Sequence, residues 1–177
     1  VRLAQGQVGA YFRGRFEWGP RSLGQRSIIA DPRAIGMRER VNEKIKFREA
    51  FRPFAPAVLE EETAKWFDLG KSRDRLLLPF MCTVLEATEA GRKLLPAVVH
   101  VDGTARVQTV AKETHPEFYN LLQCFQEQTG VGVLLNTSMN LKDEPICSSP
   151  LEAYGLFLRS DIDFLALENS LVTKEAA

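Results

Sequence analysis

A helix pattern that runs directly into a strand pattern is the feature that most constrains how this chain can fold. The spacing of apolar residues predicts a helix over residues 116–129, and Gly130 ends it because glycine commonly follows a helix C-terminus. The apolar stripe consists of Phe118, Leu121, Leu122 and Phe125. Thr114 and Glu117 have the spacing of a capping box at the start of this helix. The apolar run 131–135 then predicts a buried strand that stops where the polar residues begin.

Strand and helix patterns alternate along the rest of the chain as well. Strands are expected at residues 7–13, 26–30, 57–60, 79–85, 105–110, 163–167 and 170–172. Helices are expected at residues 33–45 with Met37, Val41 and Ile45 on one face, at residues 61–65, and at residues 150–159 after a capping box formed by Ser149 and Glu152. Residues 70–75 are expected to form a mobile surface loop. The interleaving predicts an α/β domain with a mixed, twisted open sheet covered by helices.

The length and the charge balance of the chain limit the number of domains and the kinds of partner that can be expected. A chain of 177 residues, 45% of them apolar, can bury one core, so a single domain over residues 1–177 is expected. Its 23 basic and 23 acidic residues balance, so nucleic acid is not an expected partner. Since no long apolar run and no signal-peptide pattern occur, a cytoplasmic protein without a membrane segment is expected. Residues 1–5 read like the end of a helix, which suggests a piece of a longer protein.

Small and hydrogen-bonding residues take the place of apolar ones in two stretches, 103–108 and 134–140. The polar side chains of residues 136–140 follow a buried strand, so they either donate to a phosphate or a carbonyl group, or cap their own backbone. Cations beside glycine, proline or strand ends are Arg21, Lys46, Arg52 and Arg106. Arginine binds phosphate through a planar fork of donors and lysine binds it as a point charge. These four cations therefore either converge on an anion or are solvated surface charges.

Familiar catalytic signatures are absent from the sequence. It has no Walker-type loop, no nucleophile elbow and no HExxH pattern. His100 is either a core histidine or a catalytic one, and Asp102 is either a turn former or a partner for Mg²⁺. The cysteines, Cys82, Cys124 and Cys147, are odd in number and lack metal-site spacing, so reduced, mostly buried thiols are expected, without a metal site. From the residues alone, the sequence indicates an anion-binding α/β domain.

Four longer motifs follow one another in order and cover nearly the whole chain. They are Gly14-Arg-Phe-Glu-Trp-Gly-Pro-Arg-Ser-Leu-Gly-Gln-Arg-Ser-Ile-Ile-Ala-Asp-Pro-Arg33, Phe51-Arg-Pro-Phe-Ala-Pro56, His100-Val-Asp-Gly-Thr-Ala-Arg-Val-Gln-Thr-Val110, and Leu135-Asn-Thr-Ser-Met-Asn140 followed by Glu144-Pro-Ile146. Together they resemble the C-terminal domain of the O-carbamoyltransferases. That family includes nodulation-factor carbamoyltransferases and enzymes that carbamoylate aminoglycoside, cephem and aminocoumarin antibiotics. Met139 stands where the family usually has an aromatic residue, and methionine fills similar space.

The resemblance implies a YrdC-like fold and one half of a transfer reaction. In that family this domain takes carbamoyl phosphate and ATP, with Mg²⁺, and forms carbamoyl-adenylate while phosphate and pyrophosphate are released. A separate N-terminal Kae1-like domain, which binds a metal ion, then passes the carbamoyl group to a hydroxyl of the acceptor. The resemblance therefore implies that this chain activates the carbamoyl group and that its partner domain receives it.

The resemblance also assigns roles to individual residues. It assigns catalytic roles to Lys46, Arg52, Arg106 and Ser138. It assigns nucleotide binding to Arg21, Thr104, Asn136 and Asn140. No protein nucleophile is needed, because carbamate itself attacks the α-phosphate and fixed cations offset the charge that develops. Where the family has Lys-Arg-Glu-like residues this chain reads Lys46-Phe-Arg-Glu49, so either Lys46 or Arg48 faces the site. The alternatives are a nucleotide- or RNA-binding module without catalysis, and a domain that only docks its Kae1-like partner; balanced charge speaks against extended RNA binding.

Overall fold

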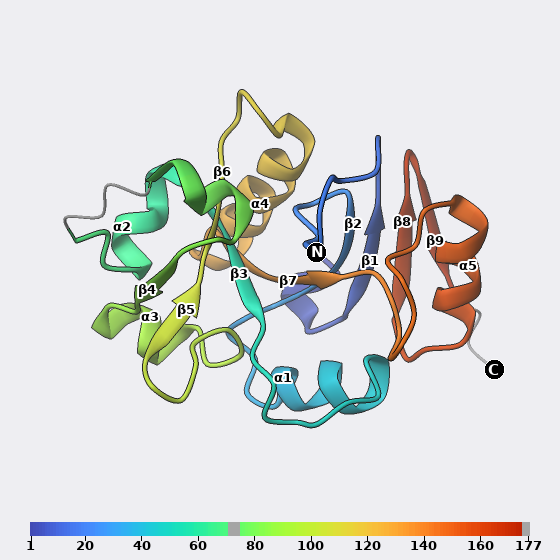
Figure 1. Cartoon of the computed structure of the whole chain (residues 1–177), viewed down its shortest axis with the longest axis horizontal. Helices are drawn as coiled ribbons and strands as arrows, with labels where there is room; N and C mark the ends of the chain where they lie inside the picture. The colour runs from blue at the N-terminus through green and yellow to red at the C-terminus, as the bar shows by residue number, and fades with distance from the viewer. Residues whose placement is uncertain (71–74, 175–177) are drawn as a thin grey trace.

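A computed structural model describes residues 1–70 and 75–174 and shows two sheets with helices around them (Figure 1). The strands are β1 (Gly9–Phe12), β2 (Arg26–Ala30), β3 (Ala55–Leu59), β4 (Val84–Glu86), β5 (Thr104–Arg106), β6 (Gln108–Val110), β7 (Val133–Ser138), β8 (Phe164–Leu167) and β9 (Ser170–Thr173). The α-helices are α1 (Met37–Arg40), α2 (Thr63–Trp66), α3 (Glu89–Leu94), α4 (Pro116–Thr129) and α5 (Pro150–Leu158). Shorter helical segments are the 3₁₀ turns η1 (Leu3–Gln5), η3 (Glu60–Glu62) and η4 (Arg75–Phe80), and the π-helical extension of α1, η2 (Val41–Ile45).

The main sheet has seven strands in the order β6-β3-β7-β2-β1-β8-β9. Strand β1 is parallel to β8 and antiparallel to β2, and β3 is parallel to β6. Strand β7 runs antiparallel to both of its neighbours, β2 and β3. A second sheet pairs β4 with β5. The predicted α/β domain with a mixed sheet is therefore confirmed, and Figure 1 shows α1 and α4 on opposite sides of that sheet.

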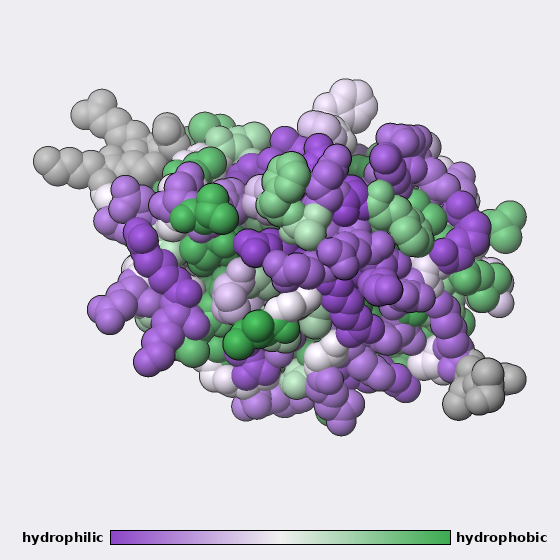
Figure 2. Space-filling model, turned by 90° about the horizontal axis from the view of Figure 1, so that it is seen from below, coloured by the Kyte–Doolittle hydropathy of each residue, from purple (hydrophilic) through white to green (hydrophobic). Residues whose placement is uncertain are grey.

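Alternating side chains of the main sheet divide the core into two layers. One layer lies against α1, η2 and α5 and includes Ala10 and Ile28, whereas the other lies against α4 and includes their neighbours Tyr11 and Ile29. Successive residues of a strand point to opposite faces, so each strand contributes to both layers. The predicted helix face is confirmed, because Met37, Val41 and Ile45 are all buried. The outer side of the α1 layer, seen in Figure 2, is mostly hydrophilic.

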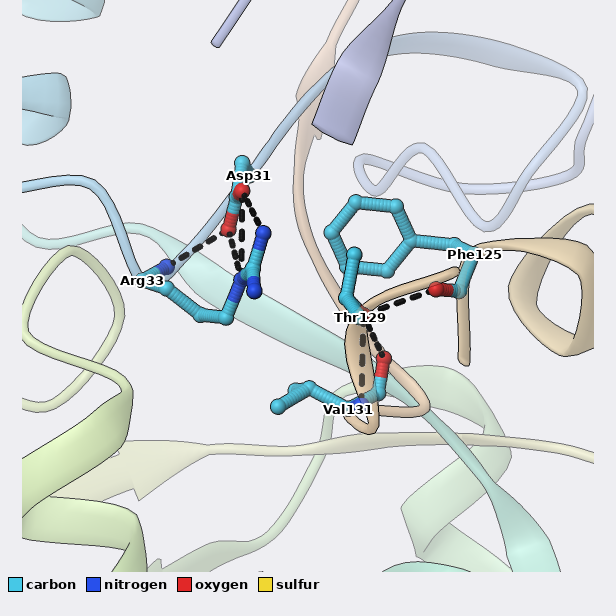
Figure 3. A network of polar contacts seen from close by, with 5 residues as sticks. All are labelled: Asp31, Arg33, Phe125, Thr129 and Val131. Atoms are coloured by element: carbon cyan, nitrogen blue, oxygen red, sulfur yellow. Dashed lines mark hydrogen bonds and ion pairs between the residues drawn. The ribbon is translucent and has the colours of Figure 1, made fainter. Parts of the chain in front are cut away.

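Two sets of polar contacts lie near the end of β2 and the end of α4 (Figure 3), and a contact between Arg33 and the Phe125 ring links them. The Asp31 carboxylate accepts hydrogen bonds from Nε, Nη2 and the backbone N–H of Arg33. The Arg33 guanidinium lies 5.5 Å from the centroid of the Phe125 ring. Thr129 Oγ1 donates to the Phe125 carbonyl at 2.7 Å and accepts from the Val131 N–H at 3.2 Å. These contacts fix the C-terminal end of α4 against the sheet, just before β7 begins.

The helix predicted over residues 33–45 is shorter than expected. It begins only at Met37, because Asp31 holds Arg33 in a turn and Gly36 has a left-handed φ of 82°. Its last five residues, Val41–Ile45, form a π-helix instead of continuing the α-helix. The side chains of Met37, Val41 and Ile45 remain on the buried side through this change.

The two predicted capping boxes have different outcomes. Helix α4 starts at Pro116 without a side-chain cap, so the box predicted from Thr114 and Glu117 is wrong. The fixed φ of proline suits the first helical position and accounts for this start. At α5, Ser149 Oγ accepts from the Glu152 N–H at 3.3 Å, as predicted. The Glu152 carboxylate, however, accepts from the Ser148 N–H at 2.7 Å instead of from Ser149.

Two strand predictions are wrong, and both concern the small sheet. The stretch 79–85 is not a strand, because Pro79 lies in the 3₁₀ turn η4 and only Val84 to Glu86 pair with β5. The stretch 105–110 is two strands that separate at Val107, since β5 pairs with β4 while β6 pairs with β3 in the main sheet. Of the loop expected at residues 70–75, residues 71–74 lie outside the described part of the chain.

The cysteines are free, as expected, but their burial differs from the prediction. Only Cys147 is buried, whereas Cys82 and Cys124 are exposed. Cys124 lies on α4 but is not among its buried residues, which are Phe118, Leu122 and Phe125. Within the described ranges, no helix combines the length and the apolar character that crossing a bilayer requires.

Replacing Gly9 with alanine is expected to destabilise the fold. A Cβ at this position would overlap with the ring of Phe164, which lies across Gly9 from the neighbouring strand β8. Overpacking of this kind costs about 1–3 kcal/mol, to be measured as a lower free energy of unfolding in urea. The matched control is Gly155→Ala in α5, where a Cβ meets no atom within 4 Å and alanine should stabilise by about 0.5–1 kcal/mol. A Gly9→Ala variant as stable as the control would contradict the prediction.

Candidate functional site

Two small cavities adjoin at the end of β7, and six cations line their walls. The arginine cavity has a volume of about 100 Å³, and its lining includes Arg21, Ser22, Arg48, Arg106, Asn136 and Ser138. The lysine cavity has a volume of about 180 Å³, and its lining includes Lys46, Arg48, Arg52, Ser138, Asn140 and Lys142. The two share Arg48 and Ser138. Among the described residues, Arg52 alone of these six cations has a carboxylate within ion-pair distance, Glu49 at 3.9 Å.

Segments far apart in the sequence supply these cations because of the way β7 is paired. Strand β7 lies between β2 and β3, with Ser138 opposite Ser27 of β2 and Asn136 opposite Ala55 of β3. The loop before β2, the segment before β3 and the end of β7 therefore meet. These three segments carry Arg21, then Lys46, Arg48 and Arg52, then Ser138, and the end of β5 adds Arg106.

Glu17 holds the loop that carries Arg21. One carboxylate oxygen, Oε1, accepts hydrogen bonds from the backbone N–H groups of Leu23, Gln25 and Arg26 at 2.9, 2.5 and 3.1 Å. Hydrogen bonds to an ionised acceptor are stronger than those to a neutral one. This irregular loop thus has a fixed path from Glu17 to β2, and Arg21 lies within it.

Lys46 is buried at the inner end of the lysine cavity and bonds only oxygen atoms. Its Nζ lies 2.7 Å from the Ser138 carbonyl, 2.8 Å from the Asn140 carbonyl and 2.7 Å from Asn140 Oδ1. Asn140 Oδ1 also accepts from Ser138 Oγ at 2.6 Å, and Asn140 Nδ2 donates to the Glu144 carbonyl. Arg52, by contrast, is exposed at the outer rim. Lys46 therefore fixes the path of the chain from Ser138 to Asn140 while placing a charge behind the cavity.

Burial, followed by the nearby charge of Arg48, lowers the pKa of Lys46 to about 7. Lys46 therefore loses its charge as the pH rises through neutrality, whereas sulfate keeps its double charge. Sulfate affinity, measured by calorimetry, is expected to fall about 3–10-fold between about pH 6 and pH 8, which corresponds to about 0.7–1.4 kcal/mol. In a Lys46→Met variant the affinity should be independent of pH over this range. An equal fall in the variant would assign the effect to another group.

Arg48 presents its guanidinium to both cavities. Its Nε donates to Asn42 Oδ1 at 2.6 Å, and its guanidinium carbon lies 4.8 Å from the centroid of the Phe54 ring. Burial, with a smaller effect of Arg52, lowers the pKa of Arg48 from its ordinary value. The sequence left open whether Lys46 or Arg48 faces the site. The structure places both there, with Lys46 engaged by the backbone and Arg48 between the cavities.

Arg106 is a half-buried cation without a counter-ion among the described residues. Its Nε is buried and has no hydrogen-bond partner in this part of the chain. Burial, followed by the like charge of Arg21, lowers the pKa of Arg106. Two unpaired arginines in one small cavity repel each other, so the cavity favours an anion that would neutralise them.

Asn136 lies within β7 instead of ending it, contrary to the prediction. Its Nδ2 donates to the Ser22 carbonyl at 3.1 Å and to Gln108 Oε1 at 2.7 Å, while Gln108 Nε2 donates to the Leu23 carbonyl at 2.7 Å. Asn136 Oδ1 is buried and has no partner among the described residues. Gln108, which sequence reasoning missed, is thus part of the wall that holds the Arg21 loop. Its signal is its place at the end of the stretch 103–108, where small and hydrogen-bonding residues replace apolar ones.

Thr104 lies apart from the residues that line the two cavities. Its hydroxyl donates to Asp102 Oδ1 at 2.7 Å and lies 3.3 Å from His100 Nδ1. The Asp102 carboxylate also accepts from the Thr104 N–H, and Gly103 has a left-handed φ of 82°. Of the two readings of Asp102, the turn former is therefore confirmed. Lys142 in the lysine cavity was not singled out from the sequence, since it lies in the unmatched gap between Asn140 and Glu144 of the fourth motif.

The same series of segments is found in one family of proteins. A family model described as Carbamoyltransferase C-terminus matches residues 1–174. The chain belongs to this carbamoyltransferase family. The resemblance of the four motifs is thus confirmed, and the match extends over both cavities.

Relatives of this carbamoyltransferase C-terminal chain are much longer proteins. The nodulation protein NolNO of Sinorhizobium fredii is 45% identical over 99% of the chain and 25% of its own length. The 3'-hydroxymethylcephem-O-carbamoyltransferase of Amycolatopsis lactamdurans is 44% identical over 80% of the chain and 26% of its own length. The chain thus spans about a quarter of the length of these curated relatives.

A solved structure shows the same fold. Full-length HypF in its phosphate- and nucleotide-bound form matches 94% of the chain and 24% of its own chain, with a TM-score of 0.69 and 23% sequence identity. The YrdC-like fold that the motifs implied is confirmed by this match.

Proposed function

We propose that this chain is the activating half of an O-carbamoyltransferase and forms carbamoyl-adenylate from carbamoyl phosphate and ATP. The observation that carries the proposal is the pair of adjoining cavities lined by six cations, of which Arg52 alone has an ion-pair partner in the described part of the chain. Carbamoyl phosphate and ATP carry the negative charges that would neutralise these cations. The cephem carbamoyltransferase among the relatives and the phosphate and nucleotide bound to HypF support the same substrates.

The smaller arginine cavity suits the compact carbamoyl phosphate, and the lysine cavity suits the phosphates of ATP. Both volumes lie below the roughly 300–1,000 Å³ of pockets that enclose a drug-sized ligand. The adenosine therefore extends beyond the lysine cavity, past the exposed Arg52. Arg48 and Ser138, which belong to both cavities, lie where the two substrates meet.

The reaction needs cations and positioning, and no protein nucleophile. Water first cleaves carbamoyl phosphate into carbamate and phosphate. A carbamate oxygen then attacks the α-phosphorus of ATP, and the bond from that phosphorus to the β-phosphate oxygen breaks, so that pyrophosphate leaves. Negative charge grows on the nonbridging oxygens where the two cavities meet, and there Arg48 and Arg106 offset it. It also grows on the pyrophosphate in the lysine cavity, which Arg52 and Lys142 line.

Mg²⁺ is expected to arrive with the nucleotide. Within the described ranges, no group of three His, Cys, Asp or Glu side chains is placed to hold a metal ion. Mg²⁺ commonly keeps several waters and binds substrate phosphates, so the phosphates of ATP are its natural ligands here. We place the metal ion of the transfer step, and the choice of acceptor hydroxyl, in a Kae1-like N-terminal domain.

Pyrophosphate release tests the proposal. The protein is incubated with ATP, carbamoyl phosphate and Mg²⁺, and pyrophosphate is measured against a reaction without carbamoyl phosphate. Release that depends on both substrates and is lost in an Arg106→Ala, Lys46→Ala double variant is the expected result. Nucleotide binding without release would support instead a module that binds without catalysis. Binding to RNA that falls steeply with salt would support an RNA-binding module.

A further inference from the structure

An apolar hollow of about 430 Å³ lies on the α4 face of the main sheet, away from the two cavities. Its floor is formed by the strands, with Tyr11 of β1, Phe164 and Ala166 of β8 and Leu171 of β9. Leu3 and Leu121 stand on its sides. The volume is within the range of ligand pockets, but few polar groups reach it, so it suits an apolar surface better than a polar ligand.

The hollow exists because this face of the sheet is only half covered. Helix α4 packs against β3 and β7, whereas α5 packs against β1 and β8 from the other face. Among the described residues, no helix lies over β8 and β9 on the α4 face, and Leu171 is left 56% exposed there. Figure 1 shows the same asymmetry, with α4 near one end of the sheet and β8 and β9 at the other. An apolar face of a sheet is usually packed against a second layer, here of helices, and this part of the face has no such helix among the described residues.

The first residues of the chain have the geometry of the last turn of a helix. The Gln5 N–H is shared between the Val1 carbonyl at 3.2 Å, which is the bond of an α-helix, and the Arg2 carbonyl at 3.1 Å, which is the bond of a 3₁₀ helix. Shared bonds of this kind are common at helix ends. Arg2 has right-handed helical φ and ψ, and Gly6 has a left-handed φ of 81° while its N–H bonds the Leu3 carbonyl. A left-handed glycine at this place is a common end of a helix. Val1 and Leu3 from this turn face the hollow.

We propose that the residues preceding Val1 in the full-length protein continue this turn as a helix, and that its apolar face covers the hollow beside α4. Relatives in which the matched part is about a quarter of the length, in a family described as a C-terminus, have ample sequence before it. Such a helix ends at the hollow, because Val1 and η1 already lie against it. It would complete the second layer over β1, β8 and β9 and bury Leu171. This inference does not depend on the proposed carbamoyl chemistry.

The first test is hydrogen exchange of full-length protein followed by mass spectrometry. About ten residues before Val1, roughly three turns, should exchange at least about tenfold more slowly than an unstructured segment does. Rapid exchange in this stretch would overturn the proposal. The thiol of Cys124, which lines the hollow, should react with a maleimide about tenfold or more slowly than in urea-unfolded protein. Protection of Cys124 that increases with protein concentration would instead assign the cover to a second copy, and would overturn the proposal as well.

Comparing substitutions at two equally exposed leucines distinguishes a surface that the helix covers from one that stays open to solvent. Leu171 and Leu158 are equally exposed at 56%, but Leu158 lies on α5, outside the hollow. Leu171→Asp in the full-length protein is expected to lower the melting temperature by several degrees, because a charge would be buried under the helix. Leu158→Asp should change it by no more than about one degree. Equal small shifts for both variants would show that Leu171 stays open to solvent, contrary to the proposal.

Discussion

Replacing Arg106 with alanine is expected to reduce pyrophosphate formation from ATP and carbamoyl phosphate by about 10²–10³-fold without weakening the fold. A donor aimed at developing charge in a water-poor site stabilises the transition state more than the ground state. The Nε of Arg106 is buried without a partner, and no carboxylate within the described ranges forms an ion pair with it. Its desolvation is therefore not offset by a counter-ion among the described residues, and a bound anion would supply one.

The stability of the Arg106→Ala variant separates a functional residue from a structural one. Removing an unpaired, half-buried cation should leave the free energy of unfolding unchanged or raise it by up to about 1 kcal/mol. Arg106→Lys keeps the charge but loses the planar fork, so its activity should lie between those of the wild type and the alanine variant. Arg38→Ala is the matched control, since Arg38 is similarly sheltered but pairs with Glu39 away from the cavities. Activity within threefold of wild type, or a loss that follows a lower melting temperature, would contradict the assignment.

The sequence predicted which segments meet at the site better than it predicted what each side chain does there. Arg21 and Arg106 could be singled out because each lies beside proline or a strand end and within a family motif. Lys46 follows a helical segment and lies outside the four motifs, so its position carried a weaker signal. The partners of Lys46 could not be predicted, since they are carbonyl groups of Ser138 and Asn140, which any residue types would offer. Backbone acceptors leave no trace in the sequence.

Strand ends were also hard to predict, and β7 shows the physical reason. The apolar run stops at Leu135, but the strand continues to Ser138 because β2 and β3 supply pairing partners beyond that point. Asn136 is tolerated in this buried strand because Ser22 and Gln108 accept hydrogen bonds from its amide. The hydrophobic pattern of a sequence indicates which residues pack in an apolar core. The length of a strand depends instead on pairing with strands that are distant in sequence.

Replacing Lys46 with methionine is expected to abolish activity and to destabilise the fold by about 2–4 kcal/mol near pH 8. Methionine fills similar space but donates no hydrogen bond, so the Ser138 and Asn140 carbonyls and Asn140 Oδ1 lose the donor that holds them within 2.8 Å. The chain from Ser138 to Asn140 forms a wall of the lysine cavity, so loosening it also weakens phosphate binding there. Lys44→Met, an exposed lysine in the same helical segment, is the matched control and should retain both activity and stability.

The pH dependence of this destabilisation tests whether Lys46 is neutral in the folded protein above pH 7. The pKa of Lys46 is about 7 in the folded chain and 10.5 as the ordinary value, so between them the unfolded chain binds more protons. Wild-type stability should therefore rise with pH above about 7, by up to roughly 1.4 kcal/mol per pH unit, and the contribution is lost as the pH falls to 7. The Lys46→Met variant lacks this term, so the gap in free energy of unfolding between the two proteins should widen from pH 7 to pH 9. A gap that stays constant would show that the carbonyl oxygens around Nζ keep Lys46 protonated, in which case its charge would be a permanent part of the site.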